Sequence, residues 1–370
     1  MWGQVQPAAA RTDLYLPLLK GKTVALVVNH TSMVGSKHLV DTLVRSGVFV
    51  EFIFAPEHGF RGKANAGELV NDSVDTRTGI PIKSLYGKSK KPSPEALECV
   101  DVVIFDIQDV GTRFFTYINT LLYVAEACAE NNVELMVLDR PNPNGHYIDG
   151  PMLEPPYKSF VGLIPVPLVH GCTVGELANM YRGECWIHSA DSLRLTVIPM
   201  EGYSHQTFYA PPVKPSPNLP DIRSILLYPS ICLFEGTKFS VGRGTDYPFQ
   251  QFGSPDFPAG DTSFIPVPNA GASEPLYKGQ ICYGFNLQSI PVDTLFARAQ
   301  LDLSWLIECF QKSPRKDDFF LKNGFFSNLA GNFTLRVQIE QGTSEAEIRA
   351  SWQPGLTTYR ELRKRYLLYP

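Results

Sequence analysis

Short apolar runs that end in polar residues, each followed by helical periodicity, recur along the first 200 residues of the chain. The clearest run covers residues 102–105 and ends at Asp106 and Asp109, two carboxylates that precede a glycine. Its β-branched and aromatic residues predict a strand that is buried on both faces. From about Thr112 the apolar residues instead repeat every three or four positions, which predicts a helix. Strand, polar turn and helix form the repeating unit of open α/β sheets.

The same pattern recurs before and after this run. It predicts further strands at residues 23–29, 48–55, 133–138, 166–169 and 193–200. Strands that alternate with helices favour an α/β fold with a doubly wound, mostly parallel sheet. No G-x-G-x-x-G motif follows the first strand and no P-loop motif occurs, so the sequence indicates neither a dinucleotide nor a P-loop nucleotide as ligand.

The C-terminal part of the chain has a different character. From about residue 206 it is rich in proline, and residues 254–275 have the composition of a linker. We therefore expect two domains, residues 1–255 and a smaller α/β domain at residues 256–370. The elements expected in the smaller domain are a strand near 279–286, a helix at 293–312 and a strand at 333–339.

Composition narrows the choice of partners. The net charge is -4 and charged residues make up only 19% of the chain, so no basic stripe is available and nucleic acid is not expected as a partner. No apolar run approaches about 18 residues, so no membrane span is expected. The 7 cysteines are scattered and form no C-x-x-C pair, which argues against a structural zinc site.

Polar side chains follow five of the predicted strands. In an open parallel sheet, ligands bind beyond the carboxyl ends of the strands, so these side chains are the first candidates for a site. They are Asn29 and His30, Glu57 and His58, Asp106 and Asp109, Asp139 with Arg140 and Asn142, and His170. Any one of these strand ends has the simpler interpretation of a turn or helix cap, whereas five at one edge favour a binding site.

Metal and nucleophile chemistry find less support in the sequence. The histidines come from different strands with no H-x-x-x-H pair, so no metal or other cofactor is expected. No G-x-S-x-G motif occurs, which argues against a serine hydrolase. Cys172 follows a predicted strand just before a helix, where a cysteine is more often a small packing residue than a nucleophile.

Carboxylate chemistry remains. Glu57 follows Pro56 and lies between Phe54 and Phe60 in the sequence. Apolar neighbours raise the pKa of a carboxyl group, and a protonated carboxyl is what general acid catalysis at a glycosidic oxygen requires. The simpler interpretation of Glu57 is a carboxylate on a surface turn. Glu235 offers the same chemistry.

Several motifs, in order along the chain, resemble the NamZ-type exo-β-N-acetylmuramidases, glycoside hydrolases of bacterial peptidoglycan recycling. The motifs are residues 54–62, 105–113 with 116–117, 138–143, 170–178, 232–237 with 242–245, and 365–369. The resemblance runs from about Val24 to Tyr369. It implies a Rossmann-like domain joined to a smaller C-terminal α/β domain, with the active site in the cleft between them.

The resemblance also implies an activity: release of N-acetylmuramic acid from the non-reducing end of peptidoglycan fragments. It implies Glu57 as the catalytic acid, with Asp106, Asp109 and Tyr117 stabilising the transition state or activating water. Arg113 or Arg243 is expected to pair with the lactyl carboxylate of muramic acid, although Arg113 is equally a candidate structural partner of an aspartate. The other residues expected to contact substrate are Asn29, His30, His58, Arg61, Asp139, Arg140, Asn142, His170 and Glu235.

Two other functions stay open at this point: a non-enzymatic muramyl-sugar-binding module and a metal-dependent hydrolase. The expected partners are peptidoglycan-derived muramyl saccharides, and the expected state is a monomer or a homodimer. The expected compartment is the periplasm or the cell exterior, with the cytoplasm as the alternative.

Overall fold

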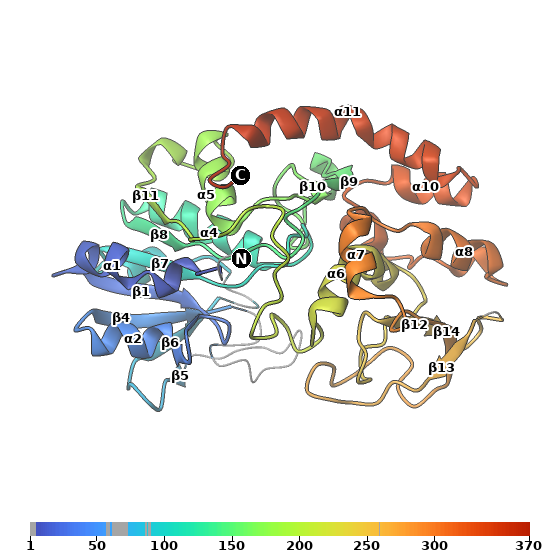
Figure 1. The fold of residues 1–370 in the computed structure, drawn as a ribbon, viewed down its shortest axis with the longest axis horizontal. Helices are drawn as coiled ribbons and strands as arrows, with labels where there is room; N and C mark the ends of the chain where they lie inside the picture. Colours follow the sequence, from blue (N-terminus) through green and yellow to red (C-terminus); the bar gives the residue numbers. More distant parts are fainter. Residues whose placement is uncertain (1–4, 57–59, 61–72, 86, 88–89, 259) are drawn as a thin grey trace.

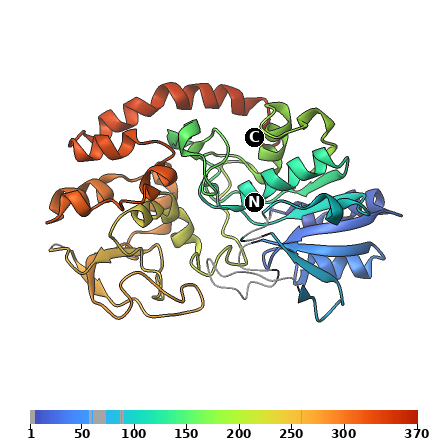
Figure 2. The ribbon, with the colours of Figure 1, turned by 180° about the vertical axis from the view of Figure 1, so that it is seen from behind.

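The computed structural model describes residues 5–56, 60, 73–85, 87, 90–258 and 260–370. Figure 1 shows two units side by side, a sheet flanked by helices and a smaller C-terminal unit. The long helix α11 (Glu345–Lys364) runs along one side of both, and Figure 2 shows the same arrangement from behind. Among the described helices, none is long and apolar enough to cross a membrane.

The sheet of the larger unit has 7 strands in the order β11-β8-β7-β1-β4-β6-β5. All neighbouring strands are parallel except β5, which is antiparallel to β6. The prediction of a doubly wound, mostly parallel sheet is therefore confirmed. The strands are β1 (Thr23–Val28), β4 (Phe49–Ala55), β5 (Ser73–Val74), β6 (Pro81–Ser84), β7 (Val102–Asp106), β8 (Glu134–Leu138) and β11 (Leu195–Ile198).

Strand β7 is buried along its whole length because helices cover both faces of the sheet. Val103 and Phe105 join one core cluster together with residues of α4 (Tyr117–Glu130) and α5 (Val174–Gly183). Val102 and Ile104 join the other cluster together with residues of α2 (Leu39–Arg45). Successive side chains of a strand point to opposite faces, so an uninterrupted apolar run is what a strand at this position requires.

The direction of strand order reverses at β1. From β1 the chain moves outward to β4 and β6 on one side, and then returns to β7, β8 and β11 on the other. The loops that follow β1 and β7 therefore leave in opposite directions and open a crevice at the carboxyl edge of the sheet. Such a topological switch point is the usual ligand site of open α/β sheets.

The strand predicted at residues 166–169 is present, but the prediction that it belongs to the parallel sheet is wrong. Residues 167–169 form β10 (Pro167–Val169), which pairs antiparallel with β9 (Asp149–Met152) in a separate two-stranded sheet. Pro165 and Pro167 have no N–H to donate, which suits such short, peripheral pairing better than a central strand. A bridge between Thr112 and Val169 still brings His170 close to the turn after β7.

The smaller unit is built on an antiparallel sheet in which β14 lies between β12 and β13. The predicted domain boundary at residue 255 falls between β12 and β13 of this one sheet. The predicted strand at 333–339 is wrong, because these residues form a helix, and the predicted helix at 293–312 is interrupted at Ala299, whose φ is positive. The elements are α6 (Ile222–Ile231), β12 (Gln251–Ser254), β13 (Thr262–Phe264), β14 (Cys282–Asn286), α7 (Val292–Arg298), α8 (Ser304–Lys312), α9 (Phe325–Ala330) and α10 (Thr334–Glu340).

The remaining short α-helices and strands belong to the larger unit. They are α1 (Thr12–Tyr15), α3 (Pro94–Leu97), and the hairpin of β2 (Met33–Val34) and β3 (Lys37–His38). Three described helices are capped reciprocally at their N-termini, by Thr173 with Glu176 at α5, by Asp221 with Ser224 at α6 and by Ser344 with Glu347 at α11.

Candidate active site

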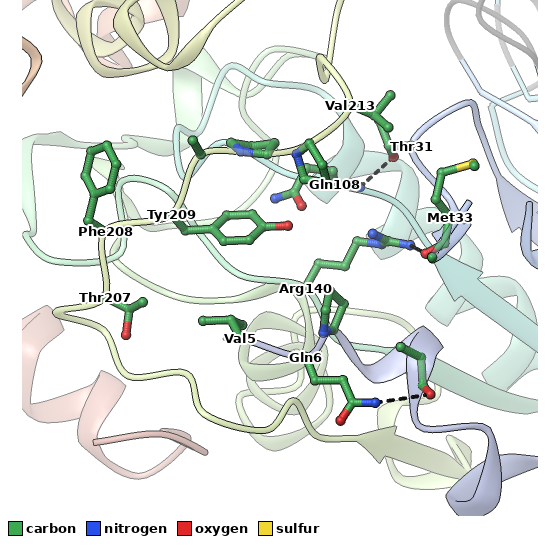
Figure 3. Close-up of a pocket in the computed structure, with 16 residues that line it drawn as sticks. Val5, Gln6, Thr31, Met33, Gln108, Arg140, Thr207, Phe208, Tyr209 and Val213 are labelled. Atoms are coloured by element: carbon green, nitrogen blue, oxygen red, sulfur yellow. Dashed lines mark hydrogen bonds between the residues drawn. The ribbon is translucent and has the colours of Figure 1, made fainter. Parts of the chain in front are cut away.

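A cavity of about 810 Å³ lies at the switch point of the sheet. Thr31 and Met33 line it from the turn after β1, Gln108 from the turn after β7 and Arg140 from the turn after β8. Residues 207–213 form the opposite wall (Figure 3). The cavity is thus the crevice that the strand order predicts, and its polar groups come from three neighbouring strand ends.

Arg140 and Asp106 form a buried ion pair at the floor of this cavity. Arg140 Nη2 donates to Asp106 Oδ2 at 2.9 Å and its Nε donates to Oδ1. Burial opposes the charge on Arg140, but the facing carboxylate outweighs it and raises the pKa of the guanidinium. Both oxygens of Asp106 are engaged, so its contacts describe an anchor for Arg140 rather than a group that faces a ligand.

A network of short hydrogen bonds joins the turns after β1 and β7. Asn29 Oδ1 accepts from the backbone N–H of Thr31 at 2.9 Å and from its hydroxyl at 2.6 Å. Thr31 Oγ1 in turn accepts from the N–H of Gln108 at 3.0 Å, and the Ser32 hydroxyl donates to the carbonyl of Asp106. Asn29 therefore shapes the turn that presents Thr31 to the cavity, and its contacts here are with the protein itself.

Gln108 is a cavity residue that the sequence interpretation missed. Its side-chain amide donates to the carbonyls of Asp109 at 2.8 Å and Pro141 at 2.6 Å. Both amide hydrogens are thereby used, which leaves Oε1 as an acceptor toward the cavity. Gln108 lies between Asp106 and Asp109 in the sequence, and this position could have identified it as a cavity residue. The sequence analysis instead favoured the two charged residues.

Tyr209 and Phe208 were also missed, since they lie in the irregular segment after β11. Tyr209 points its hydroxyl toward Arg140 across the cavity (Figure 3). Burial raises the pKa of Tyr209 while Arg140 opposes this, so the phenol stays protonated and remains a hydrogen-bond donor. Phe208 is 46% exposed and packs edge-on against Phe296. Aromatic side chains of this kind offer the flat apolar surface on which sugar rings stack.

Asp109 and His170 form a second buried polar group behind the cavity. Asp109 Oδ2 accepts from the N–H of Gly111 at 2.6 Å and lies 3.7 Å from His170 Nε2. His170 Nδ1 accepts from the N–H of Cys172, which places the imidazole proton on Nε2. Neither Asp109 Oδ1 nor His170 Nε2 has a hydrogen-bond partner among the described residues. This pair keeps the capacity to bind a water molecule or a ligand atom.

Arg113 does not reach the cavity. It is fully buried, and its two terminal nitrogens donate to the carbonyls of Pro151, Val166, Leu329 and Ala330 at 2.7–3.1 Å. Burial lowers the pKa of this guanidinium to about 9. It pairs with neither of the aspartates considered in the sequence analysis, and the structure gives its predicted contact with substrate no support.

Asp139 and Asn142 are also held by the protein itself. Asp139 accepts from the hydroxyls of Thr173 and Tyr369, each at 2.7 Å, and from the N–H of Gly175. Burial raises its pKa to about 7, a shift that these hydrogen bonds oppose. Asn142 Nδ2 donates to a backbone carbonyl at 2.8 Å. Both residues fix loops behind the cavity.

A second cavity, of about 420 Å³, lies in the smaller unit. Glu235 and Arg243, both predicted to contact substrate, line it together. Arg243 Nε donates to Glu235 Oε1 at 2.7 Å. The structure therefore brings together these two predicted residues, which are eight positions apart in the sequence. They line a different cavity from the one at the carboxyl ends of β1, β7 and β8.

The other predicted residues lie as follows. Tyr117 begins α4, is 2% exposed and packs edge-on against Phe115. His30 Nε2 lies 2.8 Å from the carbonyl of Lys214. Glu57, His58 and Arg61 lie outside the described residues, and their roles stay predictions.

The metal and thiol alternatives can be compared with the described part of the chain. Within it, no group of three or more His, Cys, Asp and Glu side chains could hold a metal ion. Cys172 is buried, its sulfur lies 3.3 Å from the hydroxyl of Tyr359, and burial raises the pKa of its thiol to about 12. A thiol with this pKa is a packing residue and not a thiolate nucleophile.

Comparison with known proteins gives full-length matches. Residues 24–223 match the family model described as exo-beta-N-acetylmuramidase NamZ, N-terminal, and residues 226–369 match the C-terminal model of the same family. The peptidoglycan beta-N-acetylmuramidase NamZ of Bacillus subtilis is 42% identical over an alignment of 373 positions, which covers 96% of this chain and 89% of that protein.

Two crystal structures of DUF1343 family proteins from Bacteroides fragilis also match this chain. One has a TM-score of 0.92 at 44% identity and the other a TM-score of 0.80 at 28% identity. In each case the match covers 99% of both chains. The two-unit architecture is therefore shared over the whole length of these proteins.

Proposed function

The chain belongs to the NamZ family of exo-β-N-acetylmuramidases, and we propose that it is an exo-acting glycoside hydrolase that releases N-acetylmuramic acid from the non-reducing end of peptidoglycan fragments. The observation that carries this proposal is the match to both NamZ family models, which together span the sheet unit and the smaller unit. The cavity at the switch point supports it, because aromatic and hydrogen-bonding side chains line that cavity from several loops.

Glu57 is the proposed general acid. Strand β4, which precedes it in the sequence, ends at Ala55 next to β1, and β1 carries the turn that lines the cavity. Phe54 and Phe60 are buried, at 2% and 4% exposure. These two neighbours in the sequence are anchored in different core clusters. The proposed role requires that the carboxyl group of Glu57 is protonated before it transfers its proton to the leaving oxygen.

The first test is hydrolysis of a chromogenic β-N-acetylmuramic acid glycoside by the wild type and by Glu57→Gln. A glutamine cannot donate the proton, so we expect kcat to fall by about 10²- to 10⁴-fold. Glu51→Gln, a change of the same chemistry in strand β4, serves as the matched control and is expected to retain activity.

The outcomes separate the hypotheses. Equal rates for Glu57→Gln and the control would exclude Glu57 as the acid. Binding of muramyl sugars by the wild type without any turnover would indicate a sugar-binding module instead. Loss of activity in EDTA, restored by a divalent metal, would indicate a metal-dependent hydrolase.

We further propose that the protein acts on muramyl saccharides in the periplasm or outside the cell, where its substrate is produced, and that it works as a monomer or homodimer. Cell fractionation with an antibody to the protein tests the first statement. Light scattering on the purified protein tests the second, and a larger assembly would contradict it.

A further inference from the structure

Arg243 presents unused hydrogen-bond donors to the second cavity. Its Nε donates to Glu235, whereas no described residue accepts from its Nη1 or Nη2. A guanidinium carries five N–H donors in a planar fork that matches the two oxygens of a carboxylate. An open fork at the wall of a 420 Å³ cavity is therefore a receptor for a carboxylate group.

The orientation of Arg243 is fixed before any ligand arrives. Glu235 holds its Nε, and the guanidinium lies over the ring of Phe249 with its carbon 5.0 Å from the ring centroid. The flanking residues Gly242 and Gly244 have φ angles of 76° and 79°, a conformation that side chains other than glycine rarely adopt. A side chain held in this way loses little conformational freedom on binding, which favours affinity and selectivity.

Among the described residues that line the second cavity, Arg243 is the charged group that is available to bind an anion. Glu235, its ion-pair partner, is only 23% exposed, and its second oxygen faces the Cys232 thiol at 3.4 Å. Glu274, the other acidic residue in the wall, pairs with Lys278 at 3.0 Å. Each carboxylate thus has a cationic partner, while Arg243 keeps both terminal nitrogens for a ligand.

Other arginines that the sequence analysis considered are less suited to this role. Arg113 uses its terminal nitrogens on four backbone carbonyls. Arg140 binds both oxygens of Asp106 through two of its nitrogens. Arg140 Nη2 also donates to the carbonyl of Met33 at 3.3 Å, so Nη1 is its one terminal nitrogen without a described acceptor, and Arg140 offers no two-nitrogen fork to a ligand.

One segment connects the two cavities. Residues 207–213 line the first cavity, and five residues later Asn218 donates to the carbonyl of Gly271, which lines the second cavity. Five residues of extended chain span at most about 17 Å. A single segment therefore forms part of the wall of one cavity and supports the wall of the other.

We propose that Arg243 is a specificity-determining residue that binds the lactyl carboxylate of the muramyl sugar, and that the second cavity takes this acidic group. The proposal rests on the proposed function, which supplies the muramyl substrate. The lactyl carboxylate distinguishes N-acetylmuramic acid from N-acetylglucosamine, which is otherwise the same sugar. A site built to bind this carboxylate discriminates strongly against a substrate that lacks it.

The test combines two enzymes with two substrates. The substrates are a chromogenic β-N-acetylmuramic acid glycoside and its derivative with the lactyl carboxyl converted to a carboxamide. For the wild type we expect kcat/KM to fall by roughly 10- to 100-fold on the amide, mostly through KM, as for the loss of a charge-assisted hydrogen bond. For Arg243→Met we expect a similar loss on the acid and almost no further loss on the amide.

Three further variants sharpen the result. Arg298→Met is the matched control, because Arg298 also pairs with an acidic residue, lies over the ring of Trp305 and has 27% of its side chain exposed, as Arg243 does. We expect it to keep the full preference for the acid. Arg243→Lys keeps the charge, so it is expected to retain part of the preference even if Arg243→Met folds poorly. Glu235→Gln leaves Arg243 less firmly positioned and is expected to raise KM for the acid more than for the amide.

The outcomes decide the proposal in each case. An equal preference for acid over amide in the wild type and Arg243→Met overturns it, as does a preference lost in Arg140→Lys but kept in Arg243→Met. If the wild type hydrolyses neither substrate, the proposed function fails, and calorimetric titration with free N-acetylmuramic acid and its amide then decides the role of Arg243. Equal affinity of the wild type for these two sugars would refute it.

Discussion

Replacement of Arg113 by methionine tests how the two units are joined. Its guanidinium binds the carbonyls of Pro151 and Val166 in the larger unit, and those of Leu329 and Ala330 at the C-terminal end of α9 in the smaller one. The carbonyls of a last helical turn have no intrahelical partner, and the helix dipole there favours a cation. We predict that Arg113→Met lowers the free energy of unfolding by about 3 to 4 kcal/mol.

The magnitude follows from the groups left behind. Val166 also accepts from the N–H of Leu153 at 3.2 Å, so it keeps a partner in the variant. The other three carbonyls, at about 1 kcal/mol or more for each lost bond, give about 3 kcal/mol. Incomplete packing of the shorter side chain adds about 1 kcal/mol. Burial of the Arg113 charge is itself unfavourable, as its lowered pKa indicates, and methionine removes this charge. Its removal therefore offsets part of the loss.

Urea unfolding followed by tryptophan fluorescence measures the effect. Arg182→Met, on the exposed side of α5, is the control and is expected to stay within about 0.5 kcal/mol of the wild type. Arg113→Lys keeps the charge but has three donors on one nitrogen, so we expect an intermediate loss. A loss below about 1 kcal/mol for Arg113→Met would refute the reasoning, because the carbonyls would then have found other donors.

Three further predictions concern stability. Burial lowers the pKa of His146 from 6.5 to about 4, so at a pH between these values the unfolded chain binds a proton at His146 and the folded protein does not. Thermal stability should therefore fall as the pH drops from 6.5 to 4. His146→Gln should flatten this part of the profile of Tm against pH. Gly331→Ala, at a φ of 81° and against the buried guanidinium, should destabilise by more than about 1 kcal/mol in urea unfolding. Tyr369→Phe removes bonds to Asp139 and to a backbone N–H, and should cost about 1 to 2 kcal/mol by the same measurement.

The central strands were predictable because both faces of the sheet are covered. A strand in this position must be apolar throughout, and residues 23–28, 49–55, 102–106 and 134–138 are recognisable for that reason. The polar residues after them indicated the edge that carries the cavity. Which of these residues face a ligand depends on hydrogen bonds between loops, and periodicity carries no information on those.

The error at 333–339 has an identifiable physical cause. Phe333, Leu335, Val337 and Ile339 alternate with polar residues, which is the period of a half-buried strand. In α10 only Leu335 and Ile339, four residues apart, are buried, while Phe333 is 47% exposed. The apolar pattern is compatible with a strand, which has a period of two residues, and with a helix, which has a period of about 3.6 residues. Packing against neighbouring helices favours the helix.

Arg113, Arg140 and Arg243 differ in their partners, and this difference determines their roles. Four carbonyls surround Arg113, which makes it a joint between the units. One carboxylate binds Arg140 through both oxygens, which makes it a rigid part of the cavity floor. A single bond holds Arg243 and leaves its terminal nitrogens available. All three lie in motifs that the sequence analysis singled out, but these partners come from positions up to 217 residues away. Charge and motif therefore identify where an arginine matters, whereas the number of donors left unused indicates whether it can bind a ligand.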